Sequence, residues 1–376
     1  MLYFDNAATT QPSKTAFLRA QAFALEQFYN PSALYNEGYA LQSELKKARS
    51  ALLSKVADES AFELIFTSCG TESDNQAIFG FAKRGNAVTT AGEHSAVSAP
   101  FAELKNRGVI EPRVAPLQKD GRVDVAALLA LVDDKTSFVS VMHVNNEVGA
   151  INDINAIAKA VKNKNPRVIF HSDGVQAYGK IPVRLCKEVD LYAISAHKIG
   201  GLKGVGALIK RKSLALPPYL IGGGQESGKR SGTENTFGIM QFVYAAEEKF
   251  ATLKTDQERL IALRERLWDG LDKSVYTRIS PVDGTPYILS VSAVGLRGEV
   301  LLHMANDKGL IVGTGSACSS NAKSRYSKIV LACGHDEKTA DGTLRLSFSP
   351  ATTLEEVNDA VNILNEIGQD LTRRMK

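Results

Sequence analysis

Short runs of β-branched and aromatic residues alternate with longer, helix-like stretches between about residues 60 and 210. This alternation predicts an α/β fold in which helices cover a mostly parallel, buried sheet. The runs lie at 64–67, 87–90, 138–142, 168–170, 191–194 and 206–209. Polar segments follow several of these runs, and ligands of parallel sheets bind beyond the carboxyl ends of the strands. The polar segments therefore mark the first candidate site.

The pattern changes after residue 239. From 239 to 275 the chain has no proline, and its leucines recur at helical spacing, which predicts one long amphipathic helix. Farther along, we expect helices at 298–307 and 354–371 and a strand at 310–312. We interpret the long helix as the connection between a large domain, residues 13–255, and a smaller α+β domain, residues 256–376 together with 1–12.

Composition and charge narrow the class of protein. Of 376 residues, 44% are hydrophobic and 23% are charged, as in ordinary globular proteins. The formal net charge is only +4 and the basic clusters are short, so we expect no direct contact with nucleic acid. No apolar run is long enough to span a membrane, and the N-terminus does not resemble a signal peptide. The four cysteines and six histidines are scattered, which predicts a cytoplasmic protein with free thiols and no metal site.

The segment FTSCGTESDNQAIFGF, residues 66–81, combines a strand end, a glycine and a helix start. Thr71 and Asp74 have the spacing of a capping box that opens a helix. Free N–H groups at a helix N-terminus attract anions such as phosphate. Many capped helices bind nothing, so this segment alone does not identify a phosphate site.

Two later segments carry groups with chemical potential. Lys198 follows a strand and is either a solvated loop residue or a desolvated amine that can form a Schiff base with a carbonyl cofactor. Asp173 follows another strand, where it either caps a helix at 174–178 or balances a cationic ring nitrogen, as expected for pyridoxal phosphate. A phosphate cradle, a carboxylate and a lysine in this order, each at a strand end, are much more specific together than any one of them.

Motifs spread over nearly the whole chain match one known family. They are YFDNAATT at 3–10, YNPSALY at 29–35, FTSCGTESDN at 66–75, EHSAV at 93–97, MHVNNEVGAI at 142–151, HSDGVQAYGKIPV at 171–183, SAHKIGGLKGVGAL at 195–208, GGGQESGKRSGTEN at 222–235 and GTGSACSS at 313–320. In these motifs the sequence resembles the class V aminotransferases, and within them the cysteine desulfurases of the NifS/IscS type. The GSACSS motif is similar to the long-loop branch of that group.

The resemblance implies a homodimer of the aspartate aminotransferase fold, which is fold type I of the pyridoxal-phosphate enzymes. It implies conversion of L-cysteine to L-alanine, with the sulfur left as a persulfide on an enzyme cysteine. Lys198 would be the Schiff-base lysine and Cys318 the cysteine that forms the persulfide. A protein acceptor would then receive the sulfur for iron–sulfur cluster assembly or for tRNA or cofactor thiolation.

The family's other roles carry over position by position. Asp173 would pair with the pyridine nitrogen, Gln176 would hydrogen-bond the phenolic oxygen of the cofactor, and His94 would stack on the ring and move protons. The residues implied for the phosphate are Gly70, Thr71, Ser195, His197 and, from the other subunit, Thr233. For His94, ring packing without a proton role is the competing interpretation.

The substrate side is also implied by the resemblance. Asn145 would lie beside the ring and the substrate, and Asn30 and Arg345 would bind the substrate carboxylate. An arginine can bind a carboxylate through two parallel hydrogen bonds, although a structural salt bridge is the competing explanation for Arg345. Four positions depart from the family's usual pattern. Cys69 stands where glycine is common, Gly174 where alanine is common, and Ala33 and Tyr35 replace the usual serine and histidine after Asn-Pro-Ser.

Cys318 needs activation, because a free thiol with a pKa near 8.5 is only a few per cent ionised at pH 7. We expect this activation to come from the site itself. Two rival functions remain open from the sequence. One is a selenocysteine lyase or another class V pyridoxal-phosphate enzyme, and the other is a catalytically silent sulfur-transfer partner.

Overall fold

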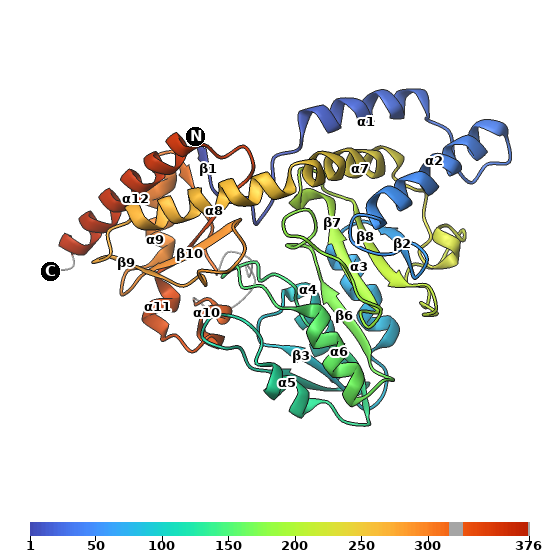
Figure 1. The fold of residues 1–376 in the computed structure, drawn as a ribbon, viewed down its shortest axis with the longest axis horizontal. Helices are drawn as coiled ribbons and strands as arrows, with labels where there is room; N and C mark the ends of the chain where they lie inside the picture. Colours follow the sequence, from blue (N-terminus) through green and yellow to red (C-terminus); the bar gives the residue numbers. More distant parts are fainter. Residues whose placement is uncertain (316–325, 375–376) are drawn as a thin grey trace.

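The computed structural model describes residues 1–315 and 326–374. Its largest feature is a seven-stranded sheet (Figure 1). In sheet order the strands are β2 Phe62–Thr67, β8 Gly206–Arg211, β7 Leu191–Ser195, β6 Ile169–Asp173, β5 Thr136–Ser140, β3 Asn86–Thr90 and β4 Glu111–Ala115. Strand β8 is antiparallel to β2 and β7, and the pairs from β7 through β4 are parallel. The predicted α/β fold with a mostly parallel sheet is confirmed.

Helices cover both faces of this sheet, because side chains alternate between the faces along each strand. On β5, Phe138 belongs to one hydrophobic cluster and its neighbour Val139 to the other. The Phe138 face carries α3 Gly70–Phe81 and α4 Ser95–Asn106. The opposite face carries α2 Asn36–Leu53, α5 Val125–Leu131, α6 Ile154–Lys164 and α7 Thr236–Ala251, with α1 Lys14–Glu26 packed along α7.

Strand β4 is not predicted by the hydrophobic pattern. Its sequence, EPRVA, contains a proline and two charged residues, and four of its five residues are exposed or only partly buried. In the described chain β4 pairs with β3 alone and forms the edge of the sheet. An edge strand tolerates proline and charge because one of its sides needs no hydrogen-bond partner.

The expectation of one continuous helix from 239 to 275 is wrong. The chain forms two helices, α7 and α8 Leu253–Gly270, which are separated at Thr252. Thr252 has φ −113° and ψ 6°, and its hydroxyl donates to the Asp256 carboxylate at 2.7 Å. Threonine hydroxyls compete with the helical hydrogen bonds in this way. Within the described residues, no helix combines the length and apolar character that crossing a membrane requires.

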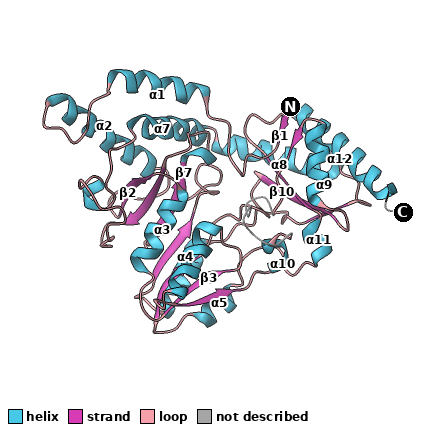
Figure 2. Cartoon of the chain, turned by 180° about the vertical axis from the view of Figure 1, so that it is seen from behind, coloured by secondary structure: helices cyan, strands magenta, loops and turns pink. Residues whose placement is uncertain are grey.

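A second group of elements has its own hydrophobic cluster, to which α8 also belongs. The group lies on the left in Figure 1 and on the right in the reverse view of Figure 2. Its elements are β9 Tyr276–Arg278, β10 Ile288–Ala293, α9 Gly298–Asp307, β11 Leu310–Ile311, α10 Lys328–Ala332, α11 Glu337–Asp341, β12 Thr343–Ser347 and α12 Leu354–Arg374. Strands β12, β10 and β9 form an antiparallel sheet, and the N-terminal strand β1 Leu2–Tyr3 pairs with β11. The expected helices at 298–307 and 354–371 and the strand beginning at 310 are confirmed.

Candidate active site

A cavity of about 360 Å³ lies at the carboxyl ends of β6 and β7. Ligands of parallel sheets bind at this edge, and small-molecule sites commonly measure about 300–1,000 Å³. The residues named from the sequence that line the cavity are Gly70, Thr71, His94, Asp173, Gln176, Ser195, His197, Lys198 and Arg345. The tertiary structure therefore collects most of the candidate residues in one place.

Lys198 closes the short turn η1 Ala196–Lys198, which follows β7. Its Nζ donates hydrogen bonds to the backbone oxygens of Ala7 and Ala8, each at 2.7 Å. The neighbouring residue His197 is held by the same N-terminal segment, since its backbone oxygen accepts from the Thr10 hydroxyl at 2.8 Å. The first ten residues thus form one wall of the cavity, and the Lys198 amine lies against that wall.

Asp173 is the last residue of β6, and only 4% of its surface is exposed. Its Oδ1 accepts a hydrogen bond from the backbone N–H of Val175 at 2.9 Å, and residues 175–180 form turns, so the alternative of a helix cap is wrong. Burial raises the pKa of Asp173, while His94 and Lys198 oppose that rise. A carboxylate buried in this way is stable as an anion only beside a cation.

His94 is the N-cap of α4. Its Nδ1 accepts a hydrogen bond from the backbone N–H of Ala96 at 3.1 Å. Burial lowers the pKa of His94, whereas nearby Asp173 raises it. Because Nδ1 accepts, a neutral ring carries its proton on Nε2. In this arrangement Nε2 is a hydrogen-bond donor. To act as a base at Nε2, the neutral ring must carry its proton on Nδ1 instead, and it then loses the hydrogen bond that caps α4.

The predicted capping box at Thr71 and Asp74 is wrong. Helix α3 begins at Gly70 with Cys69 as its N-cap, and no side chain caps it. Asp74 instead lies inside the fold, where its Oδ1 is 3.3 Å from Nε2 of His171. The first N–H groups of α3 therefore remain available to an anion, as at any helix start that lacks a side-chain cap.

Two polar side chains face the start of α3 across the cavity. The Ser195 hydroxyl is buried and has no hydrogen-bond partner among the described residues. Nδ1 of His197 lies 3.2 Å from the hydroxyl of Thr9. Burial and the neighbouring Lys198 lower the pKa of His197 to about 4, so the ring is neutral at pH 7. Together with the helix start, this is a set of donors suited to a phosphate group.

Arg345 comes from β12 and closes the opposite side of the cavity, with 2% of its surface exposed. Its Nη2 pairs with Oδ1 of Asp5 at 2.7 Å, and its Nη1 donates to the backbone oxygen of Asn146 at 2.9 Å. Its Nε has no hydrogen-bond partner among the described residues. The structural salt bridge considered from the sequence is present, and the guanidinium also keeps one donor for a further group.

Several residues named from the sequence do not line this cavity. Asn145 uses its side chain within its own turn, donating to Gly92 and accepting from the backbone N–H groups of residues 147 and 148. Asn30 is exposed in the connection before α2, where its Oδ1 accepts from the backbone N–H of Ser32. Thr233 lies in the 222–235 segment, beside Phe66 and Arg230. Cys318 lies outside the described residues.

Sequence reasoning missed three polar residues of the cavity wall, Asp74, Ser95 and Asn146. Burial and the nearby Asp173 raise the pKa of Asp74 well above its usual value, and burial lowers the pKa of His171 to about 3. The His171 ring is therefore neutral at pH 7. The available signal for Asp74 was a carboxylate three residues after Thr71, near the start of a predicted helix. The capping interpretation explained that carboxylate in another way.

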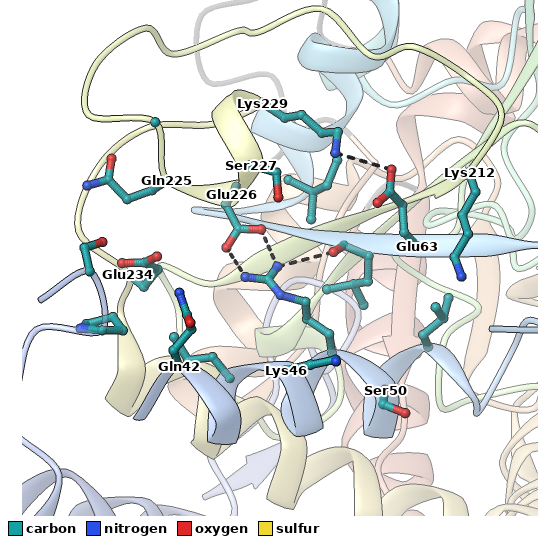
Figure 3. A pocket seen from close by; sticks show the side chains of 18 of the residues that line it. Gln42, Lys46, Ser50, Glu63, Lys212, Gln225, Glu226, Ser227, Lys229 and Glu234 are labelled. Atoms are coloured by element: carbon teal, nitrogen blue, oxygen red, sulfur yellow. Dashed lines mark hydrogen bonds and ion pairs between the residues drawn. The ribbon is translucent and has the colours of Figure 1, made fainter. Parts of the chain in front are cut away.

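A larger hollow of about 600 Å³ lies between α2, β2 and the 222–235 segment (Figure 3). Arg49 of α2 bonds to the carboxylate of Glu226, with its Nη2 2.6 Å from Oε1. Figure 3 shows Glu226 in this hollow and Lys229 paired with Glu63. Glu226 and Ser227 have φ values of +52° and +55°, in the left-handed region. The hollow brings no nucleophile or base together with an anion-binding helix start. Over the described residues, no three His, Cys, Asp or Glu side chains group as metal ligands.

Comparison with known proteins adds three relatives. The family described as "Aminotransferase class-V" matches residues 2–359. A protein named "Cysteine desulfurase IscS" from Methanosarcina thermophila is 37% identical over 98% of this chain and 92% of its own length. A solved structure titled "NIFS-LIKE PROTEIN" is 34% identical with a TM-score of 0.90, covering 97% of this chain and 98% of that one. Another, titled "SspA in complex with cysteine", is 27% identical with a TM-score of 0.80, covering 94% and 100%.

Proposed function

The chain belongs to the class V aminotransferase family, and from this premise we propose which of its residues carry out the reaction. The protein is a pyridoxal-phosphate-dependent cysteine desulfurase that acts on L-cysteine. The observation that carries the assignment of residues is one cavity that holds the Lys198 amine, the buried Asp173 carboxylate and an uncapped helix start.

The groups of the cavity fit pyridoxal phosphate. Lys198 supplies the amine for its aldehyde, and Asp173 supplies a buried carboxylate for its ring nitrogen. Donors for its phosphate come from the start of α3, from His197 and from the Ser195 hydroxyl, which has no hydrogen-bond partner among the described residues. When bound, the cofactor withdraws electrons from the substrate Cα. Around it, Asp173 would keep a proton on the ring nitrogen, the Lys198 amine would take and return the Cα proton, and His94 would offer a proton at Nε2.

The substrate carboxylate has two candidate partners in this chain. Arg345 lines the cavity and keeps its Nε free of other partners in the described chain, so we assign it this role. Asn30 lies in an exposed turn outside this cavity, and its role remains part of the proposal. Asn145 holds the turn that presents its neighbour Asn146 to the cavity, which supports a positioning role beside the substrate.

We assign the persulfide to Cys318. The described chain stops just beyond Gly313, whose backbone N–H and C=O pair with those of Arg345 at 3.0 and 2.8 Å. Cys318 follows Gly313 by five residues, which span at most about 17 Å when extended. The thiolate would attack the substrate sulfur, so that an S–S bond forms while the substrate C–S bond breaks and L-alanine is left.

Mass spectrometry after incubation with L-cysteine and pyridoxal phosphate tests this assignment. The wild-type protein should gain one sulfur atom on Cys318, and Cys318→Ser should gain none and form little alanine. Cys69→Ala is the matched control, because Cys69 lines the cavity and its loss should leave the added sulfur in place. Wild-type turnover by Cys318→Ser, or sulfur found on Cys69, would refute the assignment.

The active unit in our proposal is a homodimer to whose sites Thr233 contributes from the second subunit. Large apolar side chains are exposed around the 222–235 segment and the connection from α1 to α2, among them Leu25, Phe28, Leu34 and Ile221. Apolar groups gathered like this on one side of a protein mark an interaction surface. Sedimentation should give twice the chain mass, and Thr233→Ala should weaken cofactor binding without changing that mass.

The remaining parts of the proposal concern the cell and the domain division. The persulfide sulfur would pass to a protein acceptor in the cytoplasm, for iron–sulfur cluster assembly or for thiolation of tRNA or cofactors. We place the boundary between the domains at 255/256, with residues 1–12 in the smaller one. Support for this boundary comes from Phe4 and Ala7, which pack in the same hydrophobic cluster as α8 and α12.

A further inference from the structure

A buried lysine that the reaction does not use lies behind the cavity. Lys180 is in the turn that follows β6, and only 3% of its surface is exposed. Its Nζ donates a hydrogen bond to Oε1 of Gln176 at 2.7 Å. The backbone oxygen of Lys180 accepts from the side chain of Gln257 on α8 at 3.1 Å. Burying an amine costs free energy. Among the described residues, the one side-chain oxygen that accepts a hydrogen bond from Lys180 belongs to Gln176, which suggests that this contact has a function.

The contact determines which way round the Gln176 amide lies. Burial lowers the pKa of Lys180 well below its usual value, and in either protonation state the amine has N–H groups that donate to the amide oxygen of Gln176. On the other side, Nε2 of Gln176 donates to the backbone oxygen of Ala7 at 2.8 Å, and a carbonyl oxygen can only accept. The two partners therefore agree on one orientation, although amide orientation is otherwise ambiguous from atomic positions alone.

This orientation places the amide nitrogen beside the reactive amine. The backbone oxygen of Ala7 accepts from Gln176 and also from Lys198 Nζ at 2.7 Å. Gln176 itself lines the cavity. The opposite orientation would present a carbonyl oxygen there, which repels an oxyanion. The charged groups near Lys180 are Lys198, Lys249 and Arg345, and the Tyr287 ring lies 5.8 Å from its Nζ.

We propose that Lys180 is a positioning residue, which holds the Gln176 amide with its N–H group toward the cavity so that the site donates a hydrogen bond to the phenolic oxygen of the bound cofactor. The inference rests on the role proposed above for Gln176. A donor at that oxygen stabilises its ionised form, so it lowers the pKa of the cofactor chromophore. Lys180 acts on the chromophore through Gln176 alone.

The experiment titrates the absorption spectrum of the protein loaded with pyridoxal phosphate, without substrate, for a set of variants. Lys180→Met keeps the length of the side chain and removes its donors. It should raise the chromophore pKa by about one unit and weaken cofactor binding several-fold. Lys180→Arg keeps a donor-only group and should restore the wild-type titration. Lys180→Glu offers only acceptors to Gln176, and it should shift the pKa at least as far as Lys180→Met.

The double variant Lys180→Met/Gln176→Ala decides the matter. Gln176→Ala alone should raise the chromophore pKa, and adding Lys180→Met should change it no further. A further shift of full size would overturn the inference, because Lys180 would then act through its own charge. An unchanged titration in Lys180→Met would also overturn it. If Lys180→Met does not fold, Lys180→Leu takes its place in the same comparison with and without Gln176→Ala.

The failure of this inference is distinguishable from that of the proposed function. If Gln176→Ala leaves the titration unchanged, the role proposed for Gln176 is wrong and the inference falls with it. If the wild-type protein binds no pyridoxal phosphate, the assignment of the whole cavity fails. A pKa that moves in Gln176→Ala but not in Lys180→Met removes only the positioning role.

Discussion

The ring of Tyr192 occupies the space that a β-carbon at residue 174 would need. An ideal Cβ on Gly174 would lie 2.0 Å from Cζ of Tyr192, which is far inside any permitted contact. The Tyr192 ring is fully buried, and its hydroxyl lies 2.9 Å from Nδ1 of His143. The departure from alanine at 174 is therefore matched by the tyrosine on the neighbouring strand.

This pair gives the first prediction. Gly174→Ala should destabilise the protein by about 1–3 kcal/mol, because the methyl group overpacks a filled core. Replacing Tyr192 by leucine in the same chain should recover part of that loss, whereas Tyr192→Phe keeps the ring and should not. Urea unfolding of Gly174→Ala, of the two Tyr192 single variants and of the two double variants measures the coupling. Equal losses in the leucine and phenylalanine backgrounds would contradict the clash.

A second prediction separates two roles of His94, as the N-cap of α4 and as a carrier of protons. His94→Asn keeps a good N-cap acceptor, so its stability should equal that of the wild type. Its desulfurase rate should fall by about 10²–10⁴-fold, as expected for the loss of a proton-transfer group. His94→Ala should lose the same rate and also about 1 kcal/mol of stability. A wild-type rate in His94→Asn would leave only the ring-packing interpretation.

A third prediction concerns pH. Burial raises the pKa of Glu93 to about 8, although its Oε1 accepts from the backbone N–H of Met142 and the hydroxyl of Thr90. The folded state thus holds a proton that the unfolded chain releases near the usual glutamate pKa of 4.5. Stability from this group is fully present below about 4.5 and is lost as the pH rises toward about 8.

Glu93→Gln tests that sign, because glutamine keeps an acceptor and a donor but does not titrate. From about pH 5 to about pH 8, the free energy of unfolding should fall more steeply in the wild type than in the variant. Titrating histidines affect both proteins alike, so the difference between the two curves isolates Glu93. Parallel curves would show that Glu93 is ionised throughout.

A fourth prediction concerns the ion pair that holds the 222–235 segment. The Glu226 carboxylate is buried, bonds to Arg49 and accepts from the backbone N–H of Phe66, although Glu226 itself has a left-handed backbone. Arg49→Met should cost about 3 kcal/mol, because it leaves a buried charge without its partner. It should also weaken cofactor binding, since the segment carries Thr233 toward the second subunit in our proposal.

Lys46→Met is the control for this experiment. Lys46 lines the same hollow, and the structure shows no ion pair for it among the described residues. Its loss should leave the unfolding midpoint and the cofactor dissociation constant within error of the wild type. If the two variants behave alike, the effect of Arg49 comes from charge in general and not from its bond to Glu226.

Periodicity along the chain was enough to predict the layered sheet, the helices at 298–307 and 354–371, and the cluster of polar residues at strand ends. These features follow from local rules, since burial alternates every second residue in a strand and every three to four residues in a helix. The match to the family's motifs then identified Lys198 and Asp173 as candidate site residues. The same rules failed at β4 and at Thr252, where an edge position and a side-chain hydrogen bond override the pattern.

The contacts between distant segments became visible only once the chain was folded. The carbonyl of Ala7 meets the Lys198 amine, Asp5 pairs with Arg345, and Asp74 turns away from its helix start toward His171. No local pattern encodes these pairs, because each depends on the packing of segments far apart in the sequence. The sequence by itself determined which chemical groups are present. The tertiary packing decided which hydrogen-bond or ion-pair partner each group has, because it buries distant segments together.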